Sequence, residues 1–403
     1  MSKEATTAIL RRHRLPPALS LILLLELVAL GATIPVIAYY VRQLGGSALH
    51  VTFCFFLTAA PKVVMQPIWG GLSDRIGRKP VMIFSLAGSL ISYVIWAMTP
   101  SLTWLLVSRA VFGLFGAQLT IGTSIVADRL EPDLRARGMG ILGATAGIGF
   151  IIGPVLGGVV AGSTSHAAIG WMNAGLEMAA IVFALAALPE TSPRQPGSSI
   201  LQSGTARLWR VAVAHPSVRL LLLVVLVGTT GLSVIQGTLV VLAEDRWGYD
   251  VMQMGKLLSL FFLVGALIQG GGLRPLVPRF GEANLARAGY SMIAAALFLL
   301  MPETPVQVLW LSLVLVAVGT ALTTPTMTAL LSKATHEKDQ GKVQGLNQGV
   351  TGLGRSLSGA TMGGLYDRFG AATPFGISAL LVVAALLLLT GVRHEDEASP
   401  FRT

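Results

Sequence analysis

The sequence has little charge and a single cysteine. Charged residues occupy only 12% of its 403 positions, while 53% are hydrophobic; soluble domains carry roughly 25% charged residues. A chain of this length would have too little polar surface to dissolve in water, which excludes a soluble globular protein. The single Cys54 excludes an internal disulfide, and because it lies in an apolar run we expect a small buried or lipid-facing side chain.

The patterns that enzymes need are also missing. The six histidines lie mainly in tails and loops and lack metal-ligand spacing. There is no nucleophile triad and no ATP-binding P-loop. The GxG patterns within 147–158 sit in an apolar segment with no preceding strand, which excludes a dinucleotide-binding turn. We therefore expect no enzyme, no metal site and no bound cofactor.

Long apolar segments fill most of the chain. An apolar run of about 20 residues is long enough to cross a bilayer as a helix, and twelve such runs can be marked. They predict an all-α membrane protein whose first partner is the lipid bilayer. The runs are 17–41, 48–70, 80–99, 102–127, 137–162, 168–188, 217–242, 252–273, 286–301, 306–331, 341–365 and 372–391.

The basic residues fall mainly on one side of these runs. The net charge of +10 could suggest nucleic acid, but the basic residues are spread over many short loops with no single basic face, which excludes that partner. Of the 29 Lys and Arg residues, when those near the end of a run are counted with the adjoining loop, 22 lie on the side of the termini, 4 on the other side and 3 deep inside the runs. By the positive-inside rule we expect both termini in the cytoplasm and the chain in the inner (plasma) membrane.

A polar segment divides the twelve runs into six and six. Residues 190–216 are rich in Pro, Gly, Ser and Arg, the composition of a flexible linker. The glycine pattern of 153–158 recurs at 359–364, about half a chain later, which indicates an internal repeat. We predict two pseudo-symmetric six-helix bundles, at 1–189 and 217–403, joined by a cytoplasmic linker at 190–216.

The segment between the second and third runs is short, glycine-rich and charged. It reads Gly70-Gly71-Leu72-Ser73-Asp74-Arg75-Ile76-Gly77-Arg78-Lys79-Pro80. It resembles the loop signature of the major facilitator superfamily, Gly-x-Leu-x-Asp-Arg-x-Gly-Arg-Lys, which lies between that family's second and third helices. The resemblance implies a conformational latch that includes Gly70 and Gly77, in which Asp74 holds the end of a helix in the opposite half. Arg75, Arg78 and Arg129 would shape its charge network. The alternative is a plain cytoplasmic loop.

The fifth run carries a second motif, built on Gly149, Gly153, Pro154, Gly157 and Gly158. Small residues let two helices approach closely, and a proline removes one backbone hydrogen bond and bends its helix. The run resembles the antiporter motif of the same superfamily, Gly-x-x-x-Gly-Pro-x-x-Gly-Gly. That resemblance favours proton-coupled export over symport. The alternative is glycine packing without a coupling role.

Four ionisable residues lie deep in the first six runs: Glu26, Lys62, Arg109 and Glu177. Such residues face the protein interior or a wet cavity. Glu26, roughly 15 Å into its helix, is the best candidate proton carrier, the alternative being a permanent ion pair. Arg109 could keep a neighbouring acid charged or serve as a structural hydrogen-bond donor. Glu177 could take part in coupling or pair with another group. Lys62 could neutralise Glu26 or bind an anionic part of a substrate.

The last six runs carry mostly neutral polar residues at mid-helix, with Arg355 towards the outer side. This asymmetry suggests that the first half handles protons and the second half shapes substrate recognition. The candidate substrate-binding residues are Lys62, Gln236, Phe262 and Asn347.

Together, the motifs resemble those of a twelve-helix drug:proton antiporter of the major facilitator superfamily. The resemblance implies a monomer that exchanges protons for small molecules by alternating access, with multidrug efflux and antibiotic resistance as the expected consequence. One alternative is a proton-coupled exporter of a specific metabolite such as a sugar, a siderophore or an organic anion. Others are an uptake symporter, which the fifth-run motif disfavours, and a non-transporting membrane sensor or scaffold.

Overall fold

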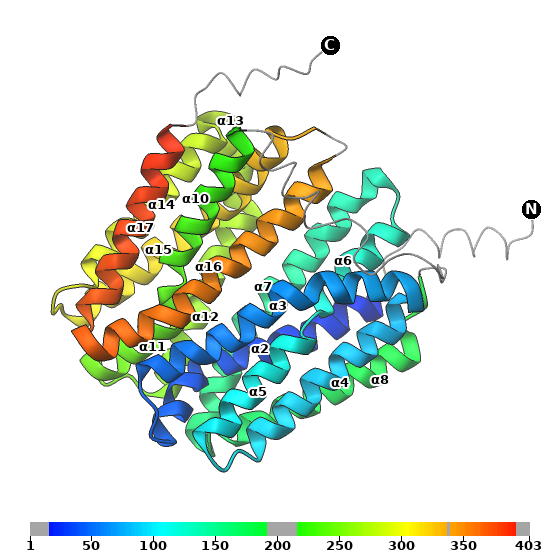
Figure 1. The fold of residues 1–403 in the computed structure, drawn as a ribbon, viewed down its shortest axis with the longest axis horizontal. Helices are drawn as coiled ribbons and strands as arrows, with labels where there is room; N and C mark the ends of the chain where they lie inside the picture. The colour runs from blue at the N-terminus through cyan, green and yellow to red at the C-terminus, as the bar shows by residue number, and fades with distance from the viewer. Residues whose placement is uncertain (1–15, 192–215, 337–338, 392–403) are drawn as a thin grey trace, which may run out of the picture. The chain divides into compact units, whose positions relative to one another are not determined.

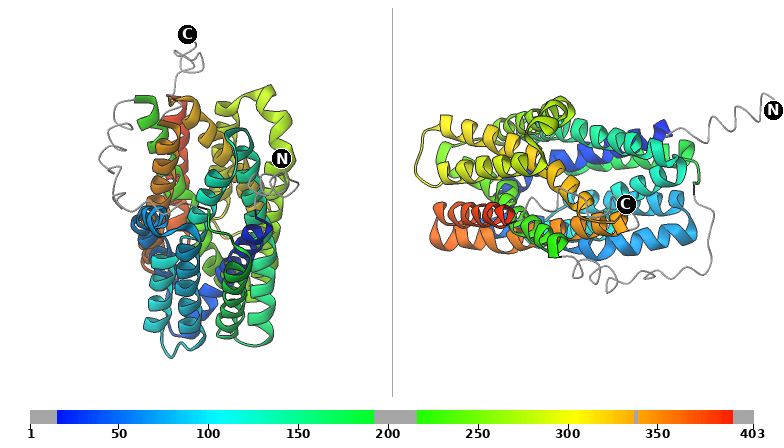
Figure 2. Two further views of the ribbon diagram at one scale, coloured as in Figure 1. Left: turned by 90° about the vertical axis from the view of Figure 1, so that its right-hand side faces the viewer. Right: turned by 90° about the horizontal axis from the view of Figure 1, so that it is seen from above.

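A computed structural model describes residues 16–191, 216–336 and 339–391, and the described residues are helical with no strand (Figures 1 and 2). The helices of the first half are α2 (Pro17–Gln43), α3 (Ala48–Ile76), α4 (Arg78–Ala97), α5 (Leu102–Phe115), α6 (Gln118–Arg129), α7 (Pro132–Ser163) and α8 (Ala168–Ala187). Those of the second half are α10 (Pro216–Leu232), α11 (Val234–Trp247), α12 (Val251–Leu267), the π-helical turn η1 (Ile268–Gly272), α13 (Leu273–Phe280), α14 (Glu282–Leu299), α15 (Val306–Lys333), α16 (Gln340–Phe369) and α17 (Ala372–Thr390).

Ten helical segments in the described ranges are long and apolar enough to cross a membrane. The two predicted runs without this property are those that became α14 and α16. α14 has only 18 residues and carries Glu282 and Arg287, and α16 is rich in glycine and polar side chains. Both are nevertheless continuous helices, so the prediction of an all-α membrane protein is confirmed.

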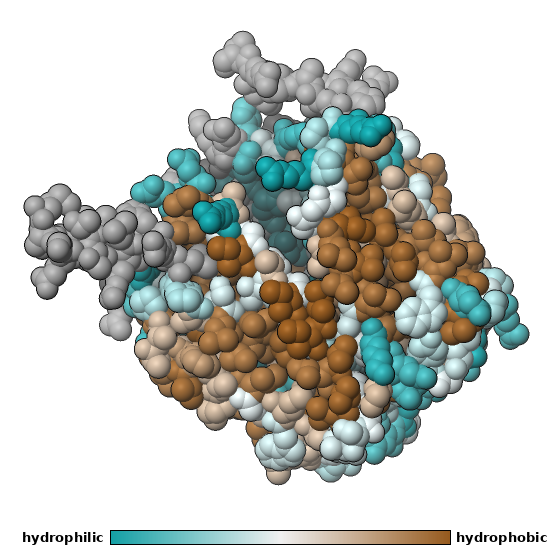
Figure 3. All heavy atoms as spheres, turned by 180° about the vertical axis from the view of Figure 1, so that it is seen from behind, coloured by the Kyte–Doolittle hydropathy of each residue, from teal (hydrophilic) through white to brown (hydrophobic). Residues whose placement is uncertain are grey.

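Apolar side chains cover much of the outer surface. Figure 3 shows many hydrophobic residues at the surface of one face. Exposed apolar areas this large are unusual for a soluble monomer and fit contact with lipid. The most exposed large apolar side chains include Phe84, Trp171, Leu185, Leu380 and Leu387.

Two predicted single runs are divided in the structure. The run at 102–127 separates into α5 and α6 at Gly116 and Ala117, and the run at 217–242 separates into α10 and α11 at Ser233. At the first break, the indole of Trp69 donates to the carbonyl of Leu114 at 2.8 Å, and the amide of Ala117 donates to the hydroxyl of Ser85 at 3.1 Å. These side chains satisfy backbone groups that a continuous helix would have paired internally.

The prediction of a loop at 70–80 is wrong. α3 continues as a helix to Ile76, and α4 begins at Arg78, so Gly77 alone turns the chain. Gly77 has φ of 108°, a left-handed value that glycine adopts without strain. A β-carbon at Gly77 would lie 2.8 Å from the carboxyl carbon of Glu190. One residue can therefore make the turn because its missing side chain leaves room for that carboxylate.

Glycines of positive φ occur at matching turns of the two halves. Gly45 and Gly248 follow the first helix of each half, with φ of 78° and 66°. Gly77 and Gly281 follow the second helix of each half, with φ of 108° and 75°. The matching turns support the internal repeat seen in the sequence.

The described chain packs into two compact units that interleave in sequence. Unit 1 falls within 1–40, 61–202 and 251–259, and unit 2 within 41–60, 203–250 and 260–403. The predicted division at 1–189 and 217–403 places 41–60 and 251–259 differently, and most of the predicted linker at 190–216 lies outside the described residues. The two-bundle division remains a prediction.

Each unit has its own helix packing (Figure 2). In unit 1, α4 packs against α8 and α5, and in unit 2, α10 packs against α17 and α16 while α14 packs against α15 and α17. The core of unit 1 contains aliphatic and aromatic side chains, with Leu23, Leu86, Tyr93 and Phe112 fully buried. The ionisable groups of unit 1 are held in this apolar surrounding.

Candidate functional site

The glycines of the fifth-run motif face α2 within unit 1. A β-carbon at Gly149 would lie 2.7 Å from that of Leu27, and one at Gly153 would lie 2.7 Å from the carbonyl oxygen of Val28. At Gly157 it would overlap the backbone of Ala32. The motif therefore brings the backbone of α7 directly against α2, the helix that carries Glu26.

The other side of the motif faces the start of α12. A β-carbon at Gly158 would lie 2.8 Å from the carbonyl oxygen of Val251, and one at Gly255 would overlap the carbonyl oxygen of Pro154. Pro154 stands inside α7, where a proline removes one backbone hydrogen bond. This part of the motif thus packs α7 against the segment of α12 that belongs to unit 1.

Two carboxyl groups are buried in unit 1. Glu177 on α8 is 0% exposed and Glu26 on α2 is 3% exposed. The two acids interact electrostatically with each other, and Lys62 on α3 attracts both. The structure therefore brings together three of the four ionisable residues that the sequence placed at depth.

Hydrogen bonding around the two acids is incomplete. Within the described residues, both carboxyl oxygens of Glu177 and the Oε2 atom of Glu26 are buried without a hydrogen-bond partner. Nearby on α8, the amide of Asn173 donates to the carbonyl of Ala29 at 3.0 Å and to the hydroxyl of Thr33 at 3.1 Å, which ties α8 to α2. Buried acids that lack partners are expensive when charged and readily carry protons.

Lys62 lies at the break in the fourth span. Its ammonium is 4.5 Å from the ring centre of Phe112, and a β-carbon at Gly116 would lie 2.8 Å from that same nitrogen. Gly116 therefore provides the space in which Lys62 sits. An ammonium held by a ring face and by the field of two acids can respond to a change in charge on either acid.

Arg109 has a different surrounding. Its guanidinium lies 4.6 Å from the ring centre of Trp96, and it donates to the hydroxyls of Ser108 at 3.1 Å and Ser92 at 3.2 Å. The rings of Tyr93 and Phe112 lie at 5.4 and 5.5 Å. This enclosure by aromatic rings and hydroxyls favours the structural interpretation of Arg109 over the coupling one.

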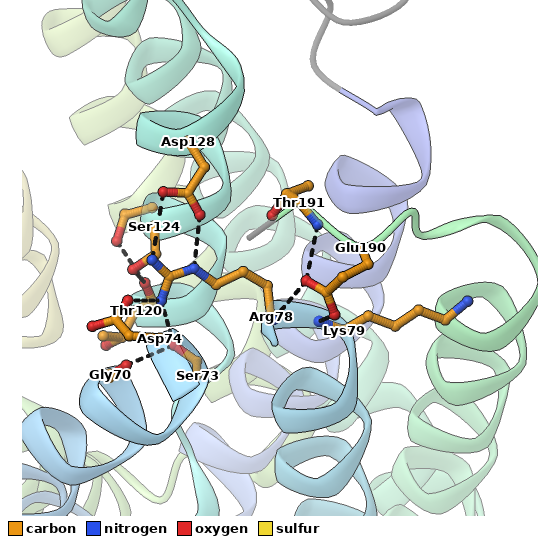
Figure 4. A network of polar contacts seen from close by, with 11 residues as sticks. Gly70, Ser73, Asp74, Arg78, Lys79, Thr120, Ser124, Asp128, Glu190 and Thr191 are labelled. Carbon is orange, nitrogen blue, oxygen red and sulfur yellow. Dashed lines mark hydrogen bonds and ion pairs between the residues drawn. The ribbon is translucent and has the colours of Figure 1, made fainter. Parts of the chain in front are cut away.

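The charged segment after α3 forms a network around Arg78 (Figure 4). The Arg78 guanidinium forms ion pairs with Asp74 at 2.7 Å and with Asp128 on α6 at 2.8 Å. It also donates to the hydroxyl of Ser73, which in turn donates to the carbonyl of Gly70 at 2.7 Å. The Arg78 side chain is only 8% exposed, whereas those of Asp74 and Asp128 are 51% and 26% exposed, so a buried guanidinium is held by partly exposed carboxylates.

Glu190 links this network to the end of α8. Its carboxylate accepts the backbone N–H groups of Arg78 at 2.8 Å and Lys79 at 3.2 Å. The Lys79 ammonium donates to the carbonyl of Leu185 at 2.7 Å. Glu190 therefore caps the positive end of α4, and Figure 4 shows it on the far side of Arg78 from Asp128.

Sequence reasoning named the centre of this network but missed two of its acids. Asp128 and Glu190 were not predicted, although Asp128 directly precedes the predicted Arg129. The signal that could have found them is the scarcity of acids, since a buried arginine needs carboxylate partners. The ion pair of Asp74 is with Arg78, in the same unit; its predicted role across the two halves remains a prediction, as do the roles of Arg75 and Arg129.

The candidate residues of the second half do not form one group. Gln236, on α11 in unit 2, lines a small cavity that also includes Arg355. Asn347 on α16 is buried and Phe262 on α12 is half-buried, and neither is among the residues that line this cavity. The prediction also left Arg355 out of the candidate set, although it lies inside a predicted span. Among the described residues, no cluster of three His, Cys, Asp or Glu could hold a metal ion.

The family model described as Major Facilitator Superfamily matches residues 19–357 and 273–402. The chain belongs to the major facilitator superfamily. The superfamily resemblance drawn from the loop and fifth-run motifs is thereby confirmed. Members of this superfamily are carriers rather than enzymes, so the chain is a multi-span membrane transporter of small molecules.

Individual members of the superfamily resemble the chain over most of its length. It is 31% identical over 340 residues to the class E tetracycline resistance protein of Escherichia coli, covering 82% of this chain and 83% of that protein. It is 29% identical over 353 residues to the major facilitator superfamily domain-containing protein 10 of Mus musculus, covering 83% and 76%.

Solved structures of superfamily transporters share the fold. The human organic anion transporter MFSD10 (TETRAN) matches with a TM-score of 0.69 at 24% identity, covering 93% of this chain and 100% of that chain. The nucleoside transporter NupG matches with a TM-score of 0.75 at 14% identity, covering 93% and 98%. At these identities the structures support the fold alone.

Proposed function

We propose that this chain is a proton-coupled exporter that exchanges protons for small organic molecules. The observation that carries the proposal is the buried pair Glu26 and Glu177, with Lys62 in reach of both. Two acids that share one cation in an apolar core cannot both be charged without a large penalty, so a proton binds there readily. Proton binding and release at Glu26 would be the coupling event, with Glu177 and Lys62 setting its charge balance.

The glycine packing supports a coupled mechanism. α7 lies directly against the backbone of α2, beside the helix position of Glu26, and against the start of α12. The structural effect of a change in charge on α2 can therefore be transmitted to α7 by direct backbone contact, because no flexible side chains lie between the two helices. We propose that the predicted bundles at 1–189 and 217–403 move against each other in alternating access, with Gly70, Asp74, Arg75, Gly77, Arg78 and Arg129 as the latch.

The names of the similar proteins support export of organic compounds. One group consists of tetracycline resistance proteins, and the other of the major facilitator superfamily domain-containing protein 10 of several mammals. We propose drug or metabolite efflux in the inner (plasma) membrane, by a monomer with both termini in the cytoplasm. A contribution to antibiotic resistance would follow if the substrates include antibiotics.

The test measures proton release from acidified inside-out vesicles with a pH-sensitive dye. A panel of lipophilic cations, neutral drugs and organic anions is added to vesicles that contain the wild type or Glu26→Gln. We expect compound-dependent proton release from the wild type and none from Glu26→Gln, because glutamine keeps the shape of the side chain but binds no proton. Glu303→Gln, a change of an exposed carboxylate, is the matched control and is expected to behave as the wild type.

Two results would contradict the proposal. If no compound releases protons from wild-type vesicles that contain folded protein, the chain is not a broad exporter coupled to protons. If Glu26→Gln releases protons as the wild type does, Glu26 is not the coupling residue.

A further inference from the structure

Arg355 lies at the middle of α16 with its side chain exposed, and none of the described residues is its counter-ion. It is the sixteenth of the thirty residues of α16, so it lies roughly 20 Å from either end of the helix at 1.5 Å per residue. No described residue gives it an ion pair or a side-chain hydrogen bond. The acids of unit 2 that form ion pairs do so elsewhere: Glu244 and Asp245 with Arg42, Glu282 with Lys333, and Asp339 with Lys342.

A charged residue in the middle of a membrane span needs compensation. An arginine at the centre of a membrane helix is costly to insert unless a partner or water compensates its charge. Arg109, by contrast, is surrounded by aromatic rings and two serine hydroxyls, and Lys62 acts on two acids. Of the three intramembrane basic residues, Arg355 is thus the one whose charge the described residues leave unbalanced.

The cavity beside Arg355 is small and is lined by six polar and four apolar residues. It leaves about 20 Å³ for the centres of water-sized molecules, and one water needs roughly 10–15 Å³ by that measure. This space admits a group the size of a carboxylate but not a whole drug molecule. Its lining residues all belong to unit 2 and include Thr52, Phe55, Ser233, Gln236, Thr238 and Ser358.

Two further hydrogen-bond donors line this space. Gln236 is exposed and its side-chain amide has no hydrogen bond to any described residue. Thr238 is 0% exposed, and its hydroxyl lacks a partner within the described part of the chain. A buried hydroxyl without a partner is uncommon in folded proteins and indicates a missing partner. Both belong to α11, which begins directly after the break at Ser233.

The break itself adds to the positive character of the site. α11 starts at Val234, next to the cavity, and the N-terminus of a helix attracts negative charge. In transporters of this general kind, interrupted helices place such ends at the substrate. Gly237 lets α11 approach α3, because a β-carbon there would lie 3.1 Å from the ring of Phe55. The ring of Phe55 forms an apolar wall beside the polar group.

We propose that Arg355 binds the anionic group of the transported substrate, with Gln236 and Thr238 as the neighbouring donors. The substrate class is an organic acid with a carboxylate and an adjoining apolar part. The guanidinium would hold the carboxylate through charge-assisted hydrogen bonds, and Phe55 would contact the apolar part. This inference rests on the proposed export function and identifies the chemistry of its substrate.

The test compares acids with their neutral amides. Purified full-length protein is titrated with benzoate and benzamide, and with 1-naphthoate and 1-naphthamide, while binding heat and thermal unfolding are recorded. We expect the wild type to prefer each acid over its amide, and Arg355→Gln to lose about 10- to 100-fold in affinity for the acids. Arg355→Lys keeps the charge without the planar donor pair and is expected to fall between the two. Arg368→Gln, on the same helix but outside the cavity, is the matched control and should bind as the wild type does.

Gln236→Ala covers the case in which Arg355→Gln does not fold. It removes one donor from the cavity and is expected to weaken binding of the acids several-fold with little effect on the amides. Equal affinity of the wild type for acids and amides would overturn the proposal. So would acid binding that survives unchanged in both Arg355→Gln and Gln236→Ala.

The outcome is distinguishable from a failure of the export proposal. Acid-selective binding that depends on Arg355, without any proton release in vesicles, would support the anion site and contradict proton coupling. Proton release driven only by cations or neutral drugs, with no preference for acids over amides, would support coupling and contradict the anion site.

Discussion

The two halves of this transporter share a glycine pattern but differ in the charge that it accompanies. In unit 1, α7 packs against α2, which carries the acid Glu26. In unit 2, α16 carries the base Arg355 on its own middle turn, beside a polar cavity. The same glycine pattern thus accompanies a buried acid in one unit and a basic residue beside a cavity in the other. The difference is what a transporter needs if protons and anionic substrates bind at separate places.

The repeated glycines of α7 and α16 also face different neighbouring helices. Gly153 and Gly157 face α2, whereas the corresponding Gly359 and Gly363 face the start of α3. On α16 it is Gly354, outside the repeated pattern, that approaches α10. α7 has Pro154 where α16 has Ala360, and a proline changes the course of its helix. Equal spacing in the sequence therefore gives close packing in both units but does not fix the partner.

The largest effect is expected from filling the glycine contacts. Gly157→Ala in unit 1 and Gly363→Ala in unit 2 would each press a methyl group into the backbone of a neighbouring helix, Ala32 or Ala48. We expect each change to destabilise the protein by about 1–3 kcal/mol or more, seen as loss of folded yield and a lower unfolding temperature. If only one of the two substitutions destabilises the protein, close helix packing through these glycines is not shared between the units.

Matched controls exist on the same helices. Gly143 on α7 and Gly349 on α16 have open space where a β-carbon would stand. Their replacement by alanine is expected to be neutral or to stabilise by up to about 1 kcal/mol through helix propensity.

The next effect is expected from the ion-pair network of unit 1. Arg78→Ala leaves Asp74 and Asp128 without their common cation and is expected to destabilise the protein by about 1.5–3 kcal/mol, as for hydrogen bonds to charged groups. Thermal unfolding in detergent measures the change. Arg137→Ala, at an exposed arginine near the start of α7, is the control and should have little effect. A similar loss from both variants would mean that total charge, rather than this network, matters.

The corresponding network of unit 2 is expected to contribute less. Arg42 pairs with Asp245 at 2.7 Å, and the hydroxyl of Tyr366 donates to the same carboxylate at 2.7 Å. The Arg42 side chain is 32% exposed, four times as much as that of Arg78, so solvent screens the pair. Arg42→Ala is therefore expected to destabilise by about 0.2–1 kcal/mol, an effect that shrinks as salt is raised. A loss as large as that of Arg78→Ala, independent of salt, would contradict this ranking.

The last expected effect is confined to a narrow range of pH and lies in unit 1. Burial against the rings of Tyr39 and Tyr40 lowers the pKa of His166, in the loop between α7 and α8, below its ordinary value. Unfolding lets this histidine bind a proton more readily, so stability is full above about pH 6.5 and falls as the pH drops towards the lower folded value, by at most about 1.4 kcal/mol per pH unit. His166→Gln is expected to flatten this part of the pH profile of unfolding temperature. His50→Gln, in unit 2, is the control and should leave the slope in place; if both flatten it equally, the assignment to His166 fails.

Predictions from the sequence were most successful where they depended on a long pattern or on a residue type that is rare in membrane spans. Apolar length gave the helices, because a bilayer requires about 20 apolar residues per span. The glycine motif gave a close helix contact, and intramembrane charges gave buried positions for Glu26, Arg109 and Glu177. Even the loop signature led to the correct superfamily, although its residues are mostly helical.

What the sequence by itself determined is therefore the class of this protein: helices that span a membrane, an internal repeat, and a small set of charges that must avoid lipid. Only the tertiary structure decided which groups meet. It placed Lys62 near Glu26 and Glu177, surrounded Arg109 with rings, gave Arg78 the carboxylate of Asp128, and left Arg355 beside a polar cavity. The reason is physical. Hydrophobicity depends on composition along one segment, whereas the partner of a charge depends on the rotation and depth of several helices that are distant in the chain.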